Sequence, residues 1–131
     1  MLVDGSDTAT SQFAGEGLTV FLPVLIYSFL QTGLSEELFF RGFLTKRLIS
    51  VFGFKIGNFI QGLLFGLLHG VFFFSVVGTI RSLLIVFITG IIGLLMGYIN
   101  EKQSGGSIIP SWLLHGFANT FASILAMFNL L

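Results

Sequence analysis

The chain has 131 residues, of which 54% are hydrophobic and only 9% charged, and its formal net charge is zero. Soluble domains carry about 25% charged residues, so this composition excludes an ordinary soluble protein and predicts a membrane protein with one compact domain. The zero net charge gives no electrostatic basis for binding nucleic acid, and the absence of cysteine excludes disulfides, thiol catalysis and thiolate metal sites.

The first 17 residues differ in composition from the rest, because they are polar, small and acidic. They lack the basic start of a secretory signal peptide, so we expect 1–17 to be a polar extramembrane segment and 18–131 to form the membrane-embedded core. No strand-like alternation is sustained in this core, so helices are the expected spanning element. The sequence therefore predicts an all-α transmembrane helix bundle.

Short polar or glycine-containing breaks divide the core into four apolar segments, which cover 18–50, 58–77, 83–100 and 108–131. Each later segment approaches the roughly 20 residues that a helix needs to cross a bilayer. The first segment is longer and has two interpretations. It is either one long kinked helix, which gives four spans, or two helices separated near Gly33, which gives five helices.

Basic residues are unevenly distributed among the breaks. The first and third breaks or their flanks hold four of them, Lys46, Arg47, Lys55 and Lys102, whereas the second holds only Arg81. The positive-inside rule therefore predicts that the loops at 46–56 and 101–107 face the cytoplasm. With one long first helix, Glu36 lies roughly 15 Å of helix rise from the first loop, in the cytoplasmic half of the membrane, at a depth close to that of His69. We therefore favour four spans.

Strongly polar residues inside a bilayer are costly and mark a protein interior or a wet cavity. The predicted spans contain six such residues with few other strongly polar groups: Glu36, Glu37, Arg41, His69, His115 and Asn119. Glu37 and Arg41 are four positions apart and share a helical face, so we expect an ion pair that supports the scaffold. Glu36 is turned by about 100° from Glu37 and is expected to point away from that pair.

The same spacing of four separates Phe65 from His69 and His115 from Asn119. We expect the Phe65 ring to pack under the imidazole of His69, and His115 and Asn119 to face one cavity. A small-residue ridge on the His69 helix is expected to allow close approach of a partner helix; it consists of Gly62, Gly66 and Gly70. One spare carboxylate and two histidines on three helices favour a functional site, with Glu36 and His69 within about 3–6 Å of each other.

Three stretches carry a family resemblance: EELFFR (Glu36–Arg41), FGLLH (Phe65–His69) and HGFAN (His115–Asn119). In this order they resemble the motifs E-E-x-x-x-R, F-x-x-x-H and H-x-x-x-N of the CPBP intramembrane proteases, also called the Abi or CAAX prenyl protease type II family. The resemblance covers about 18–131. Family members commonly carry further membrane helices, so we expect the chain to correspond to the catalytic core or to a fragment.

The resemblance implies hydrolysis of a peptide bond within the membrane. It implies that Glu36 and His69 activate a water molecule, and that His115 and Asn119 stabilise the oxyanion. Glu37, Arg41 and Phe65 would support the site. The implied substrate is a prenylated CAAX C-terminus or a peptide precursor such as a bacteriocin. The expected location is the plasma membrane of a prokaryote, with the site opening to the cytoplasmic side.

No cofactor is expected, because a glutamate-activated water needs no metal and the chain has no H-E-x-x-H sequence. The alternative is zinc held by Glu36, His69 and His115, which would leave a fourth position for water. A second functional hypothesis is a non-hydrolytic membrane protein, such as a bacteriocin self-immunity factor or a scaffold. A transporter or proton relay is a weaker third hypothesis, because few polar residues remain to line a path.

Overall fold

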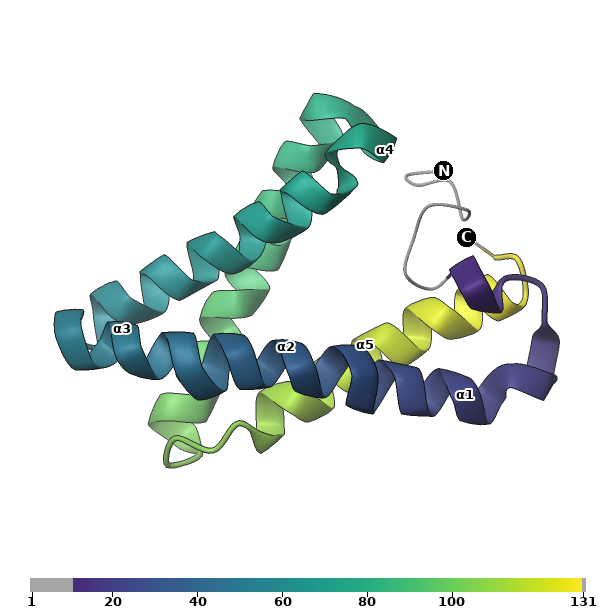
Figure 1. Ribbon diagram of the computed structural model, residues 1–131. Coiled ribbons are helices and arrows are strands. Elements are labelled where there is room, and N and C mark those ends of the chain that lie inside the picture. Colours follow the sequence, from purple (N-terminus) through teal and green to yellow (C-terminus); the bar gives the residue numbers. More distant parts are fainter. Residues whose placement is uncertain (1–10, 131) are drawn as a thin grey trace. The chain divides into compact units, whose positions relative to one another are not determined.

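The computed structural model describes residues 11–130, and within this range every regular element is helical (Figure 1). This confirms the all-α prediction; the part of the predicted extramembrane segment before residue 11 lies outside the described residues. The helices of the core are α1 (Phe21–Ile26), α2 (Ser35–Glu37), α3 (Thr45–Phe52), α4 (Phe54–Tyr98) and α5 (Ile109–Met127). Short 3₁₀ turns cover Ser11–Phe13 and Gly17–Val20, and π-helical segments cover Tyr27–Leu34, Leu38–Leu44 and Ile99–Gln103.

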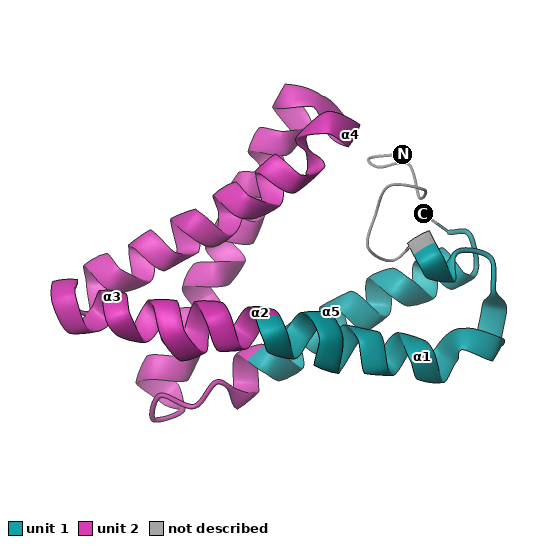
Figure 2. Ribbon diagram, in the orientation of Figure 1, with its two compact units in different colours: residues 1–35, 112–131 teal, residues 36–111 magenta. Residues whose placement is uncertain are grey.

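The chain forms two compact units (Figure 2). One unit joins the chain up to Ser35 with the stretch from Trp112 onward, and the other is the continuous stretch Glu36–Ser111. The assignment of 18–131 to a single catalytic core stays a prediction. Each unit is described by itself below.

The first helical run extends from Phe21 to Phe52 without a break, because the junctions between its α- and π-helical parts keep right-handed helical backbone angles. The hydroxyl of Thr32 donates to the carbonyl of Tyr27 at 3.2 Å, and that of Thr45 donates to the carbonyl of Phe40 at 2.6 Å. Each bond reaches back five residues, which is the spacing of a π turn. The long first helix is thus confirmed, whereas the number of membrane spans stays a prediction.

Gly33, where the sequence allowed a break, continues the helix. A Cβ atom at this position would lie 2.6 Å from the carbonyl oxygen of Ser28 in the same helix, and at an ordinary contact distance of 3.6 Å from the backbone of Gly116 on α5. Nearby, the indole Nε1 of Trp112 donates to the carbonyl of Phe29 at 2.7 Å. These contacts hold α5 against the π-helical segment Tyr27–Leu34. A small apolar core of Phe13, Val24 and Met127 closes the unit.

Two glycines end the helices of the second unit sharply. Gly53 has φ 79° and ψ 169°, and Gly78, inside α4, has φ 77° and ψ 176°. This backbone region is accessible essentially only to glycine, so each residue ends one helix and starts the next within a single position. The breaks that the sequence predicted at 51–57 and 78–82 are therefore confirmed, and α4 consists of two helices, 54–77 and 79–98.

The two helices of α4 pack against each other along the predicted glycine ridge. A Cβ atom at Gly62 would lie 2.8 Å from the side chain of Leu94, and one at Gly66 would lie 3.0 Å from the backbone of Gly90. A Cβ atom at Gly70 would collide with the side chain of Val86. The absence of side chains on the ridge therefore permits this helix contact, as the sequence predicted.

The third predicted break begins later than expected. Helical structure continues to Gln103, and the irregular stretch covers only residues 104–108. Lys46 explains the extension, because its Nζ donates to the carboxylate of Glu101 on the last helical turn and to the carbonyl of Gly106 at 2.6 Å. These two bonds connect α3 to the last helical turn and to the irregular stretch after it.

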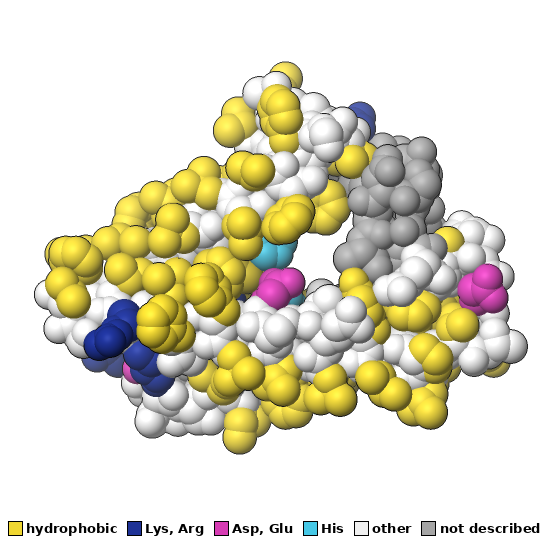
Figure 3. All heavy atoms as spheres, viewed as in Figure 1, with side chains coloured by type: hydrophobic (Ala, Val, Ile, Leu, Met, Phe, Trp, Pro, Cys, Tyr) yellow, Lys and Arg dark blue, Asp and Glu magenta, His cyan; other side chains and the backbone are white. Residues whose placement is uncertain are grey.

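The surface is largely apolar, and Figure 3 shows hydrophobic side chains over much of the visible face. The helical stretch Gly17–Gln103 is long and apolar enough to cross a membrane, and only 22% of its most apolar window is buried. The exposed large residues include Phe72 at 72%, Phe87 at 67% and Ile80 at 84%. In a bilayer such side chains face lipid at no cost, whereas in water they would form an unusually large apolar surface.

Candidate active site

Glu36 and His69 lie next to each other in the second unit. Oε2 of Glu36 is 4.0 Å from Nε2 of His69, and the two side chains are 37% and 24% exposed. Glu36 belongs to α2 and His69 to the first helix of α4, so the pair joins two helices. This separation agrees with the range that the sequence predicted and is suited to a shared water molecule.

The orientation of His69 is fixed from the side opposite Glu36. Nδ1 of the imidazole lies 2.8 Å from the carbonyl oxygen of Phe65, one turn earlier. A carbonyl can only accept, so this contact assigns the hydrogen to Nδ1 and leaves Nε2 with its lone pair in the neutral ring. The ring of Phe65 supports the imidazole at a centroid distance of 4.3 Å, as the spacing predicted.

Two acceptors therefore face each other, namely the carboxylate of Glu36 and Nε2 of His69. A water molecule about 2.8 Å from both atoms would span their 4.0 Å separation with an angle of roughly 90°, close to that between its two hydrogens. Such a water would donate one hydrogen to each acceptor and keep its lone pairs free. This is the arrangement that a general base needs for activating a water nucleophile.

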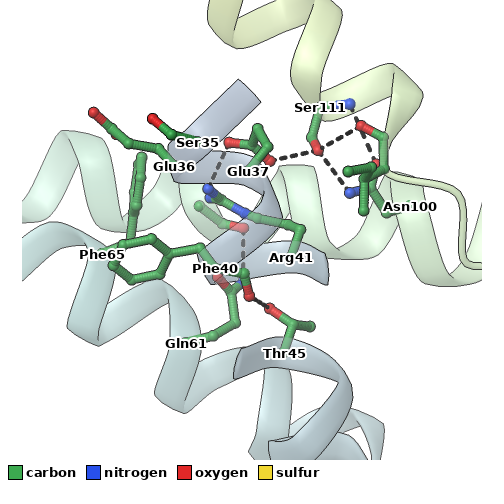
Figure 4. Close-up of polar contacts among 12 residues, drawn as sticks. Ser35, Glu36, Glu37, Phe40, Arg41, Thr45, Gln61, Phe65, Asn100 and Ser111 are labelled. Atoms are coloured by element: carbon green, nitrogen blue, oxygen red, sulfur yellow. Dashed lines mark hydrogen bonds and ion pairs between the residues drawn. The ribbon is translucent and has the colours of Figure 1, made fainter. Parts of the chain in front are cut away.

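Glu37 faces a different side of the helix from Glu36 and is fully buried. Figure 4 shows its carboxylate between Arg41 and Ser111, while Glu36 points away. Nη1 of Arg41 lies 2.8 Å from Oε1 of Glu37, and the two side chains are 1% and 0% exposed. The expected ion pair is thus present, and its burial makes it far more sensitive to loss of one partner than a surface pair would be.

The guanidinium of Arg41 also stacks over the ring of Phe65, with Cζ 4.2 Å from the centroid. Gly93 provides the space for this stack, because a Cβ atom there would lie 3.2 Å from both Arg41 and Phe65. Phe65 therefore lies between Arg41 and His69 and contacts both. A continuous series of contacts leads from the buried ion pair to the histidine of the candidate site.

Sequence reasoning missed two residues of the hydrogen-bond network around Glu37. The hydroxyl of Ser111 donates to Oε2 of Glu37 at 2.6 Å, and the amide of Asn100 donates to that hydroxyl at 2.7 Å. The backbone N–H of Ser111 donates in turn to Oδ1 of Asn100 at 3.3 Å. Serine is common in membrane helices and Asn100 falls at the end of an apolar segment, so the sequence offered no signal beyond the presence of an asparagine near the membrane.

Two further buried amides were also missed, and they join the helices of α4. Gln61 donates to the carbonyl of Gly93 and to the side chain of Asn58, both at 2.8 Å. Asn58 donates to the carbonyl of Leu94 at 3.1 Å. These bonds cross the glycine contact between the two helices, and we interpret them as structural.

His115 and Asn119 lie in the first unit, one turn apart on α5. His115 is 7% exposed, and Nδ2 of Asn119 donates to the hydroxyl of Thr32 at 2.9 Å. That bond fixes the orientation of the Asn119 amide and leaves its second N–H for another acceptor. His115 and Asn119 belong to a different unit from Glu36 and His69, and the convergence of the two pairs stays a prediction.

For a metal, the described residues contain no group of three or more histidine and carboxylate side chains arranged as ligands. Glu36 and His69 together offer one oxygen and one nitrogen, which is fewer than the three protein ligands of a catalytic zinc site. The residues brought together within the second unit therefore do not form a zinc site by themselves.

A comparison with protein families agrees with the motifs. Residues 18–121 match the family model described as Type II CAAX prenyl endopeptidase Rce1-like, and this range includes every candidate site residue. No curated protein and no solved structure matches the chain. The family is membrane-embedded and its role is that of a peptidase, which agrees with the long apolar helical stretch. The chain is a membrane protein and belongs to the Rce1-like family of type II CAAX prenyl endopeptidases.

Proposed function

We propose that this protein is an intramembrane endopeptidase that hydrolyses a peptide bond with a water molecule activated by Glu36 and His69. The observation that carries the proposal is the pair of facing acceptors, Oε2 of Glu36 and Nε2 of His69, 4.0 Å apart. The bond from Nδ1 of His69 to the carbonyl of Phe65 supports it, because it keeps the lone pair of Nε2 on the side of Glu36.

In the proposed reaction, the water oxygen attacks the carbonyl carbon of the scissile peptide bond while Glu36 accepts a proton from the water. His69 accepts the other hydrogen of the water as a hydrogen bond and so orients the attacking oxygen. When the tetrahedral intermediate collapses, the C–N bond breaks and the proton moves from Glu36 to the leaving amine. The products are a carboxylic acid and an amine, and Glu36 returns to its starting state.

We assign the stabilisation of the oxyanion to His115 and Asn119. Both side chains carry N–H donors, and they stand one helical turn apart on α5. The bond from Asn119 to Thr32 supports this role, since an amide held in one orientation loses little entropy when its second N–H binds the oxyanion. The role requires that α5 brings these donors to the Glu36–His69 pair during the reaction.

Two substrate classes suit this chemistry, namely prenylated CAAX C-termini and peptide precursors. The experiment that tests the proposal is cleavage of a labelled panel containing both classes by the purified protein in liposomes. We expect the wild-type protein to release a product from at least one class and the Glu36→Gln variant to release none. Glu16→Gln is the matched control, because Glu16 is exposed and lies outside the candidate site.

If the wild-type protein binds peptides of the panel without cleaving them, the non-hydrolytic hypothesis of an immunity factor or scaffold replaces the protease. If Glu36→Gln cleaves as fast as the wild type, the assignment of the base is wrong. The same assay after treatment with a strong chelator addresses the metal. We expect full activity to remain, and a loss that zinc restores would overturn the metal-free mechanism.

A further inference from the structure

We infer that Asn100 and Ser111 are positioning residues for the Glu36–His69 pair, acting through Glu37. This inference rests on the proposed function, because it names residues that hold the proposed base and its partner in place. Neither residue belongs to the three motifs.

The carboxylate of Glu37 is bound on both oxygens by residues that are themselves buried. Oε1 accepts from Arg41 and Oε2 accepts from Ser111. Ser111 and Asn100 are 0% and 1% exposed, and Asn100 binds Ser111 through both ends of its amide. The amide donates to the hydroxyl oxygen, so the hydroxyl hydrogen remains for an acceptor, and the carboxylate of Glu37 at 2.6 Å is closer than the carbonyl of Ile108 at 3.1 Å. Asn100 therefore selects the rotamer and the donor direction of Ser111.

Two routes connect this network to the candidate site (Figure 4). The first is the backbone, because Glu36 precedes Glu37 directly and a fixed Glu37 sets the rotation of this helical turn. With Glu37 held against Ser111, Glu36 is turned to the side of His69. A change in that rotation would move Oε2 of Glu36 away from Nε2 of His69.

The second route is a stack of side chains. Glu37 holds Arg41, whose guanidinium lies 4.2 Å from the ring centre of Phe65. Phe65 in turn supports the ring of His69 and accepts its Nδ1–H through the backbone carbonyl. Both members of the acceptor pair thus depend on the position of the Glu37 carboxylate. A displacement of about 1 Å in a reacting group can lower a rate by about a hundredfold.

The chain provides a matched control for the serine. Ser111 and Ser123 both lie on α5 and are both 0% exposed, but the hydroxyl of Ser123 has no hydrogen-bond partner. The substitutions Ser111→Ala and Ser123→Ala therefore remove the same atom from equally buried positions, and only the first removes a donor to Glu37. Ser111→Thr keeps the hydroxyl and serves as the conservative variant.

The experiment measures kcat, KM and thermal unfolding for these variants in liposomes, with the best substrate of the panel. We expect Ser111→Ala to lower kcat by about tenfold to a hundredfold with little change in KM, Ser111→Thr to recover most of kcat, and Ser123→Ala to resemble the wild type. A kcat of Ser111→Ala within about twofold of Ser123→Ala, or a folded Ser111→Thr variant no faster than Ser111→Ala, would overturn the inference.

Asn100→Ala gives a second test, which also applies where Ser111→Ala does not fold. It leaves the hydroxyl in place and removes the amide that directs it, so we expect a smaller fall in kcat, about threefold to tenfold. An unchanged kcat in this variant would contradict the inference. Glu36→Gln separates the failure of the positioning role from the failure of the proposed function. If Glu36→Gln is inactive while the Asn100 and Ser111 variants are fully active, the proposed function stands and only the positioning role fails.

Discussion

Glu36 and Glu37 are chemically identical neighbours in very different surroundings. Glu36 is partly exposed beside His69, whereas Glu37 is fully buried between Arg41 and Ser111. A helix turns successive side chains by about 100°, so adjacent positions necessarily reach different environments. The division of roles between the two carboxylates follows from this rotation.

We predict that Glu37→Gln acts through stability. The substitution leaves the charge of Arg41 buried without its counterion, and such a loss costs roughly 3–5 kcal/mol. Thermal unfolding in detergent, followed by circular dichroism, should show a large decrease in melting temperature. Glu36→Gln should unfold close to the wild type in the same measurement. An equal decrease in both variants would contradict the division of roles.

We predict that Phe65→Leu lowers activity although the residue has no chemistry of its own. Leucine cannot support both the guanidinium of Arg41 and the imidazole of His69, so the acceptor pair should lose its alignment, with a fall in kcat of about tenfold. Phe72→Leu is the control on the same helix, because Phe72 is 72% exposed. Similar rates for the two variants would show that the stack is not required.

Two of the contacts that the sequence predicted lie within one helix. The pairs Glu37–Arg41 and Phe65–His69 follow from a separation of four positions, which alone places side chains on one face. The contact between Ser111 and Glu37 joins residues 74 positions apart. No periodicity encodes such a contact, because it depends on how separate helices pack.

At the scale of elements, the helices are defined by their glycines. Gly53 and Gly78 end helices through backbone angles that other residues avoid, while Gly66 permits two helices to touch. Sequence reasoning located both ends correctly, because glycine is a strong break signal. It also allowed a break at Gly33, which is wrong for the described helix, because the backbone of Gly33 stays helical within Tyr27–Leu34.

We predict that Gly66→Ala destabilises the contact between the two helices of α4 and lowers activity. The added methyl group would lie 3.0 Å from the backbone of Gly90 and still closer to the carbonyl of Val86, so the helices must separate. The cost should be about 1–3 kcal/mol, as for other overpacked interiors. Thermal unfolding measures the loss of stability, and peptide cleavage measures the loss of activity.

Gly42→Ala is the matched control for this substitution. A methyl group there would have only ordinary contacts, at 3.7 Å from the carbonyl of Glu37 and 3.8 Å from Leu38. Alanine favours a helix over glycine by up to about 1 kcal/mol, so Gly42→Ala should be neutral or stabilising. If Gly66→Ala is equally well tolerated, the glycine ridge does not hold the helices together.

At the scale of the whole molecule, the charges are distributed along the chain in a way that predicts its orientation in the membrane. Four of the six basic residues lie in or beside the first and third predicted breaks, namely Lys46, Arg47, Lys55 and Lys102. Figure 3 shows Lys and Arg side chains gathered at one end of the second unit. The positive-inside rule assigns that end to the cytoplasm.

We predict that a cysteine at position 104 is accessible from the cytoplasm and that one at position 79 is accessible from the outside. The chain has no cysteine, so Ser104→Cys and Thr79→Cys would each carry the only thiol. An impermeant thiol reagent applied to intact cells should label Thr79→Cys alone, and Ser104→Cys should react only after lysis. Labelling of Ser104→Cys in intact cells would reverse the orientation.

The single-residue turns at Gly53 and Gly78 have a consequence for engineering the protein. An inserted epitope tag or protease site needs an exposed loop of several residues. Gly53 and Gly78 each join two helices through a single residue, so neither position provides such a loop. Among the described residues of the second unit, the irregular stretch 104–108 is the natural insertion point, although the bond from Lys46 to the carbonyl of Gly106 narrows it to the residues around Ser104. A split version of the protein cut there would separate the chain into a fragment carrying Glu36 and His69 and a fragment carrying Ser111.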